Sequence, residues 1–303
     1  MSTVTQDAPR DSAPASPMDR PTRSREIKNV IATVLMWTAF LIAVIPLIWI
    51  LSTVVVKGGN LLVDSHWWLN SQRGITNREV GGGAYHAIIG TLIQALVCAV
   101  IAVPIAVFTA IYLVEYGRGR FARLVSFMVD ILTGIPSIVA ALFIFALWVT
   151  TLKQDRVGFA VSLALVLLMI PVVVRSTEEM LKLVPNELRE ASYALGVPKY
   201  KTITRIVLPT AFSGIITGVL LGLARVMGET APLLVLGPYS KSINTDIFSG
   251  FMAALPTMIN QDRDQVLDPA VNRVWAAALT LIILVMLLNI AGRLIARLNK
   301  VSK

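Results

Sequence analysis

Residues 190 to 209 read Glu190-Ala-Ser-Tyr-Ala-Leu-Gly-Val-Pro-Lys-Tyr-Lys-Thr-Ile-Thr-Arg-Ile-Val-Leu-Pro209, a polar and basic stretch between two long apolar runs. Pro185 suits the first turn of a helix that starts near Asn186, because proline has no amide hydrogen to lose there. Gly196 fits a helix end with positive φ, and Pro198 fits the opening of the next turn. The stretch therefore predicts two short helices joined at a glycine.

The first of these predicted helices has one apolar side. Apolar groups recur along it at Leu188, Ala191, Tyr193 and Leu195. Charged groups face elsewhere, namely Glu187, Arg189 and Glu190. A short amphipathic helix held at a membrane surface is shaped to sit in a groove of another protein.

This spacing resembles the EAA loop of ABC importer permeases, the cytoplasmic coupling helix that docks on the ATPase subunit. The shared positions are Glu190, Ala191, Gly196 and the Ile-x-Leu-Pro that ends at Pro209. Ser192 stands where the family usually has alanine, and both residues are small. The resemblance implies that residues 175–205 form a cytoplasmic coupling loop and that Glu190, Ala191, Ser192 and Gly196 contact the ATPase. An ordinary basic loop between membrane helices is the alternative interpretation.

Composition places the chain among polytopic membrane proteins. Hydrophobic residues make up 55% of the 303 residues, and the mean hydropathy is +0.72, values too apolar for a soluble domain of this size. The net charge of +9 does not indicate nucleic-acid binding, which requires a basic face on a folded soluble body. We expect one all-α bundle in a lipid bilayer, and we expect the charge to reflect membrane topology.

Six apolar runs are long enough, or nearly long enough, for the roughly 20 residues that cross a bilayer. The predicted spans are residues 30–56, 86–114, 124–149, 157–174, 210–236 and 274–291. Residues 1–29 are predicted to be a disordered cytoplasmic tail that precedes a permease domain of residues 30–303. Outside the membrane we expect an irregular loop over 57–85 and an external amphipathic helix over 247–259.

Basic residues orient the bundle. With the amino terminus inside, the cytoplasmic segments carry five Lys or Arg on the tail, three after the second span, six from Arg175 to Arg205 and four at the carboxyl end. The external segments carry eight. The asymmetry predicts a multi-pass protein of the cytoplasmic membrane, with both termini and the EAA-like loop in the cytoplasm.

Motifs of catalysis and metal binding are missing from the sequence. It contains no Gly-x4-Gly-Lys-Ser/Thr, Gly-x-Ser-x-Gly or His-Glu-x-x-His. Cys98 is the single cysteine, and His66 and His86 are the two histidines, so a disulfide framework and a zinc site have no support. We expect a non-catalytic subunit without a cofactor, whose ATP and Mg²⁺ are bound by a partner.

Arg225 and Glu229 are charges within an apolar run, where an unpaired charge is costly. Four residues apart, they are predicted to share one helix face and to pair. Such a pair is either a structural ion pair or an anion site. In an anion site, the guanidinium of Arg225 would donate two parallel hydrogen bonds to an oxyanion, and Glu229 would hold Arg225 in place while no anion is bound.

The third predicted span carries a second group of polar residues. Pro136 removes an amide donor and favours a kink or a break, and Gly134 and Ser137 allow backbone or a ligand to approach. Asp130 is either a satisfied helix contact or a functional acceptor. Because phosphate near neutral pH can donate a proton and sulfate cannot, an acceptor carboxylate at Asp130 or Glu229 would distinguish the two.

The segment Arg225-Val-Met-Gly-Glu229-Thr-Ala-Pro-Leu resembles the signature of A-type permeases in phosphate ABC importers, and residues 130–139 resemble the same family. The resemblance covers most of the chain from about residue 30. It implies the type I ABC importer permease fold and a substrate path through Arg225, Glu229, Arg175, Asp130 and Ser137. For Arg175, which the family matches with an arginine, the alternatives are a positive-inside anchor or a surface pair with Glu178 or Glu179.

The resemblance further implies a set of partners. These are a second, homologous permease, a cytoplasmic ATPase dimer and an external phosphate-binding protein, with phosphate as the transported ion. Two alternatives stay open on the sequence: a permease for sulfate, molybdate or another oxyanion, and a passive channel or structural membrane subunit.

Overall fold

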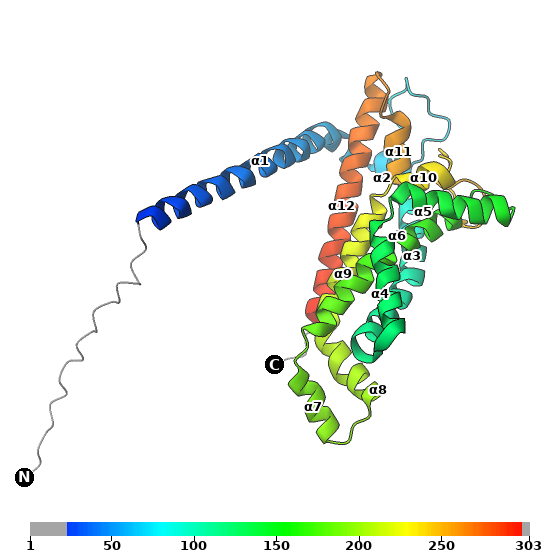
Figure 1. The fold of residues 1–303 in the computed structure, drawn as a ribbon. Coiled ribbons are helices and arrows are strands. Elements are labelled where there is room, and N and C mark those ends of the chain that lie inside the picture. Colours follow the sequence, from blue (N-terminus) through cyan, green and yellow to red (C-terminus); the bar gives the residue numbers. More distant parts are fainter. Residues whose placement is uncertain (1–22, 299–303) are drawn as a thin grey trace, which may run out of the picture. The chain divides into compact units, whose positions relative to one another are not determined.

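The computed structural model describes residues 23–298, and over that range the regular structure is entirely helical (Figure 1). The helices are α1 (Arg23–Leu62), α2 (Ser65–Leu69), α3 (Tyr85–Ile111), η1 (Tyr112–Tyr116), α4 (Gly119–Gly134), α5 (Ser137–Ile144), η2 (Phe145–Thr151), α6 (Gly158–Lys182), α7 (Asn186–Ala194), α8 (Lys199–Thr202), η3 (Ile203–Val207), α9 (Leu208–Met227), α10 (Ala231–Leu236), α11 (Leu255–Asp262) and α12 (Asp268–Leu298). The three elements labelled η are π-helical turns that adjoin α-helices.

α1 contains the first predicted span and begins before it. Residues 23–29 form its first turns, with Glu26 favourably placed near the amino end, so this part of the predicted tail is helical. Residues 1–22, the rest of that prediction, lie outside the described residues. Between Val30 and Val56 α1 carries no charged side chain, as expected of a helix that meets lipid or another membrane helix.

From Val54 onward the chain forms one compact unit, with α6 at its centre. α3 and α9 both pack against α6, and α12 packs against α9 (Figure 1). The face of α3 in this core carries only small side chains at four-residue spacing, and all four are fully buried: Cys98, Ala102, Ala106 and Ala110. Small residues in such a row let two membrane helices approach closely.

α9 approaches α6 through a row of glycines. A Cβ atom added at Gly218 would lie 2.1 Å from Ser176 Oγ, and one at Gly214 would lie 2.1 Å from Met180 Sδ. Gly222, one turn further along α9, meets Val173. Because the partners on α6 run in the opposite order, the two helices are antiparallel. Their spacing leaves no room for a side chain at Gly218.

Five described helices are long and apolar enough to cross a membrane, and there are six if the pair α4 and α5–η2 is one span. That pair is bent by 105° at Ile135 and Pro136, so of the kink or break that Pro136 predicts within 124–149, the structure has a break. The fifth span also differs from its prediction of 210–236, because α9 ends at Met227 and α10 is a separate helix.

The two segments predicted to be external are more ordered than the sequence indicates. Only the end of the amphipathic helix predicted over 247–259 is helical, because α11 begins at Leu255, and its Leu255 and Met258 are buried in the bundle. The irregular loop predicted over 57–85 is confined to residues 70–84, because α1 continues to Leu62 and α2 occupies Ser65–Leu69. Arg273 of α12, only 2% exposed, holds this loop through its guanidinium, which donates to the carbonyl oxygens of Thr76 and Glu79.

Candidate functional site

Two breaks in helices lie next to the residues that the sequence singles out. One separates α4 from α5 at Pro136, and the other separates α9 from α10 between Gly228 and Thr230. The helices that follow the breaks, α5 and α10, pack against each other. Non-helical backbone at membrane depth is tolerated only where it is buried in protein or lines a wet cavity.

Arg225 and Glu229 do not share a helix face as predicted, because Arg225 lies in the last turn of α9 and Glu229 lies in the break. Arg225 Nε is 3.9 Å from Glu229 Oε1, an ion-pair distance that is too long for a hydrogen bond. The Arg225 side chain is 53% exposed in the isolated chain and that of Glu229 is 19% exposed. The guanidinium is therefore loosely held, and its N–H groups are accessible in the isolated chain.

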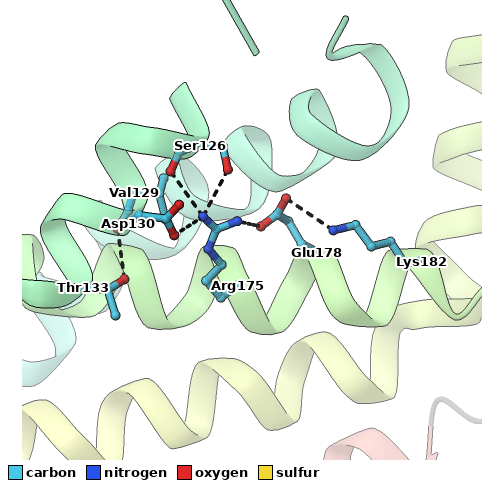
Figure 2. A network of polar contacts seen from close by, with 7 residues as sticks. All are labelled: Ser126, Val129, Asp130, Thr133, Arg175, Glu178 and Lys182. Atoms are coloured by element: carbon cyan, nitrogen blue, oxygen red, sulfur yellow. Dashed lines mark hydrogen bonds and ion pairs between the residues drawn. The ribbon is translucent and has the colours of Figure 1, made fainter. Parts of the chain in front are cut away.

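Arg175 joins α6 to α4 through a network of polar contacts (Figure 2). Its guanidinium donates to the carboxylate of Asp130, to Glu178 Oε2 at 2.6 Å and to Ser126 Oγ at 3.1 Å. Glu178 also lies 3.8 Å from the ammonium of Lys182. The Glu178 side chain is 7% exposed, whereas that of Asp130 is 63% exposed. Asp130 and Arg175, which are separate candidates in the sequence, are thus in direct contact. Of the two acids considered as partners of Arg175, Glu178 and Glu179, the arginine contacts Glu178.

The two arginines lie at different depths in the bundle. Ser176, next to Arg175 on α6, faces Gly218 of α9. Arg225 follows Gly218 by seven residues, which at 1.5 Å per residue is about 10 Å further along α9, in the direction of α10. The bundle therefore offers two guanidinium groups at separate levels of the same helix pair.

Ser137 takes no part in the Arg175 network. It opens α5 beyond the elbow formed by α4 and α5 and is half-buried. A hollow of about 320 Å³ lies at this elbow. Because only apolar side chains line it, it offers no hydrogen-bond donor to an anion. The lining residues are Leu132, Ile135, Val139, Ala140, Phe143, Leu167 and Leu168.

The loop predicted over 175–205 is shorter in the structure, because α6 continues to Lys182. Its two short helices, α7 and α8, lie at the opposite end of the bundle from α2, α10 and α11 (Figure 1). α7 begins directly after Pro185, and Gly196 has a φ of +73°. Glu190 and Ala191 are exposed, while Ser192 is buried and its Oγ lies 2.8 Å from Thr202 Oγ1. The serine that departs from the family pattern thus ties α7 to α8.

A buried contact beneath α7 was missed from the sequence. Glu115, at the end of the second span, pairs with Arg189 of α7 at 3.0 Å, and their side chains are 5% and 12% exposed. Lys199 of α8 donates to the backbone oxygen of Glu115. The available signal was that Glu115 is the sole acid between His86 and Asp130, which places a lone carboxylate next to the basic segment of Arg118, Arg120 and Arg123.

Comparison with known proteins agrees with this architecture. The family model described as "Binding-protein-dependent transport system inner membrane component" matches residues 102–300. The chain of a crystal structure of a bacterial alginate ABC transporter shares the fold with a TM-score of 0.63 at 14% identity, over 91% of this chain and 99% of that one. A chain of an inward-facing MetNI methionine ABC transporter gives a TM-score of 0.56 at 21% identity, over 72% and 94% of the two chains.

Curated relatives are much more similar in sequence. The phosphate transport system permease protein PstA of Mycobacterium leprae is 57% identical over 91% of this chain and 93% of its own length. PstA 1 of Mycobacterium tuberculosis (strain CDC 1551 / Oshkosh) is 56% identical over 90% of both chains, and PstA of Yersinia pestis is 40% identical over 89% and 90%. The all-helical type I ABC importer fold predicted from the sequence is confirmed, and the chain belongs to the PstA family of phosphate transport system permeases, within the binding-protein-dependent inner membrane components.

Proposed function

We propose that the chain is a transmembrane subunit of an ATP-driven importer that moves inorganic phosphate across the cytoplasmic membrane by alternating access. The observation that carries the proposal is the loosely held guanidinium of Arg225 at a helix break, in a chain 57% identical to a phosphate transport permease. A guanidinium matches the oxygen geometry of phosphate and donates two parallel hydrogen bonds to it.

Transport in this proposal uses the two guanidinium levels in turn. Phosphate entering from outside is met first by Arg225, with Glu229 as the acceptor for its proton. The inner station is Arg175, which must exchange its contact with Asp130 for one with the ion. Ser137 lines the path next to the break between α4 and α5. Because each station already has a carboxylate partner, phosphate competes for the guanidinium and is released readily.

The exposed charges also support a second membrane chain. Asp130 and Arg225 are more than half exposed in the isolated chain, and a charge facing lipid is costly. A second, homologous permease would cover these faces and complete the path. We further propose a cytoplasmic ATPase dimer docked on Glu190, Ala191 and the α7–α8 loop, with ATP and Mg²⁺ bound there and no cofactor in this chain, and an external phosphate-binding protein.

Uptake by reconstituted vesicles tests the proposal. The complex is purified with its membrane, ATPase and binding-protein partners, and ATP-dependent uptake of labelled phosphate is measured against unlabelled phosphate, sulfate and molybdate. We expect only phosphate to compete effectively. Stronger competition by sulfate or molybdate would replace the substrate with another oxyanion, and uptake that does not need ATP would favour a passive channel.

The orientation is tested separately in whole cells. The Leu183→Cys variant places an exposed thiol just before α7 and outside the proposed docking residues, and Cys98, being fully buried, does not compete for reagent. A membrane-impermeant maleimide should label this thiol only after the cytoplasmic side is opened. Labelling of intact cells would put α7 outside and remove the proposed ATPase contact.

A further inference from the structure

Arg189 projects from α7 into the bundle and makes contacts with two membrane spans. Its Nε and Nη2 lie 3.1 Å and 3.0 Å from Glu115 Oε1 at the end of the second span. Its remaining donors reach the end of the fourth span, because Nη2 donates to the carbonyl oxygen of Leu181 at 2.9 Å and Nη1 donates to that of Val184 at 2.6 Å. One guanidinium therefore joins the coupling loop to α6 and to η1 at once.

The other short helix of the loop is fixed to the same residue. Lys199 of α8 donates its ammonium hydrogen to the backbone oxygen of Glu115, and the ammonium lies 4.7 Å from the centre of the Tyr116 ring. Glu115 is thus held through its side chain by α7 and through its backbone by α8. These contacts converge on η1, a π-helical turn, and such turns are frequent at functional sites.

The side chains of the α7 segment differ in their surroundings. Leu188, Tyr193 and Leu195 remain exposed, at 41%, 42% and 83%, and are available to a partner. Arg189 extends instead into the bundle, where its side chain and that of Glu115 are nearly covered. A force applied to the exposed side chains therefore reaches the bundle through Arg189, and a charge pair shielded from water resists separation more than an exposed one.

We propose that Glu115 is a positioning residue for coupling: the Glu115–Arg189 pair carries the movement of the α7–α8 loop into the second span, in addition to the covalent connections of the loop to α6 and α9. This inference rests on the proposed function, because it assumes that an ATPase moves the loop. According to this inference, the second span moves together with the loop, although the two are far apart in the sequence.

The test uses Glu115→Gln, which keeps the size of the side chain and removes its charge, in the complete reconstituted complex. Spin labels at Phe108→Cys on α3 and Leu221→Cys on α9, both exposed positions, report the distance between the second and fifth spans with and without ATP. We expect Glu115→Gln to retain the ATPase and ATP hydrolysis, to lose the ATP-dependent distance change, and to import at least tenfold less phosphate per ATP hydrolysed. Glu115→Asp, which keeps the charge, should recover part of both signals.

Asp264→Asn is the matched control, because it neutralises an exposed acid in the external segment and should change neither signal. The inference is overturned if Glu115→Gln keeps the distance change, or if its thermal stability and ATPase binding fall in step with uptake, since the pair would then only hold the fold. The distance change is measured without phosphate, so it decides the role of Glu115 even if another ion is carried. Failure of the parental complex to import phosphate would count against the proposed function alone.

Discussion

Arg225 and Glu229 face each other across the break between α9 and α10, with Nε and Oε1 3.9 Å apart. A charge pair at this distance compensates charge without closing a hydrogen bond, so the guanidinium stays available. This arrangement differs from the Arg175 network, in which the guanidinium is already hydrogen-bonded to two carboxylates and a serine.

Replacing Arg225 with Gln should reduce phosphate uptake strongly. Hydrogen bonds to a charged group contribute about 1.5 to 3 kcal/mol, so losing them should slow ATP-dependent uptake by roughly tenfold to a hundredfold. Arg225→Lys keeps the charge and loses the planar guanidinium, so its uptake rate should lie between those of the parental protein and Arg225→Gln. Arg263→Gln, at an exposed external arginine, is the control. Normal uptake by Arg225→Gln in an assembled complex would remove Arg225 from the path.

The choice of phosphate over sulfate should depend more on Glu229 than on Asp130. Glu229 is loosely paired, whereas Asp130 is hydrogen-bonded to Arg175, so Glu229 is the freer acceptor for the phosphate proton. We expect Glu229→Gln to lower the ratio of phosphate to sulfate uptake, and Asp130→Asn to lower it less. An unchanged ratio in both variants would exclude the carboxylate explanation.

Glu190→Lys should disconnect transport from ATP hydrolysis. Glu190 is exposed on α7 and outside the Glu115–Arg189 contact, so the charge reversal should leave the bundle folded. Copurification of the ATPase and transport-linked hydrolysis should both decrease. Retention of the ATPase at parental levels would show that this acid is not part of the docking surface.

Much of the coupling loop could be predicted from the sequence, because proline and glycine act on the backbone locally. Pro185 and Gly196 mark the start of α7 and the turn after it, and both have the predicted conformations. The contact between Glu115 and Arg189 could not be predicted in this way, because it joins residues far apart in the chain. Its position depends on how the spans pack.

The helix breaks were only partly foreseen for the same reason. Pro136 indicates a disturbed helix, but the 105° bend depends on the packing of α5 against α10. At the second break, the four-residue spacing of Arg225 and Glu229 predicts one shared helix face, but α9 ends at Met227. The glycine row at 214, 218 and 222 is a sequence signal for close helix packing.

Gly218→Ala should destabilise the protein. The added methyl group would lie 2.1 Å from Ser176 Oγ, and overpacking of this kind costs about 1 to 3 kcal/mol. Thermal unfolding in detergent should show a lower midpoint, and Ser176→Gly in the same chain should restore part of it. Gly59→Ala, where a Cβ has no neighbour within 4 Å, is the matched control. Equal midpoints for Gly218→Ala and the parental chain would contradict the tight α6–α9 contact.

Stability of the external segment should depend on pH through Asp262. Burial raises the pKa of the Asp262 carboxyl, and attraction from Arg273 and Lys241 opposes this only in part. The folded protein therefore binds the proton more tightly than the unfolded chain, whose aspartate pKa is about 3.9. The resulting stability is present below that value and is lost as pH rises through the higher pKa of the folded state.

Between mildly acidic and neutral pH, the thermal midpoint of Asp262→Asn should therefore depend less on pH than that of the parental protein. At neutral pH the midpoint of Asp262→Asn should be the higher of the two. The midpoint is followed from mildly acidic to neutral pH in both proteins. A parental midpoint that rises with pH over this range, with the increase abolished in Asp262→Asn, would show that the carboxylate is stabilising and that the sign is reversed.

Powered import is tested most directly by phosphate accumulation in vesicles that hold the complete complex and contain either ATP or a non-hydrolysable analogue. The account predicts that labelled phosphate accumulates above its external concentration with ATP and that it does not accumulate with the analogue. Equal entry under both conditions, levelling off at the external concentration, would contradict an ATP-driven importer and identify a passive path.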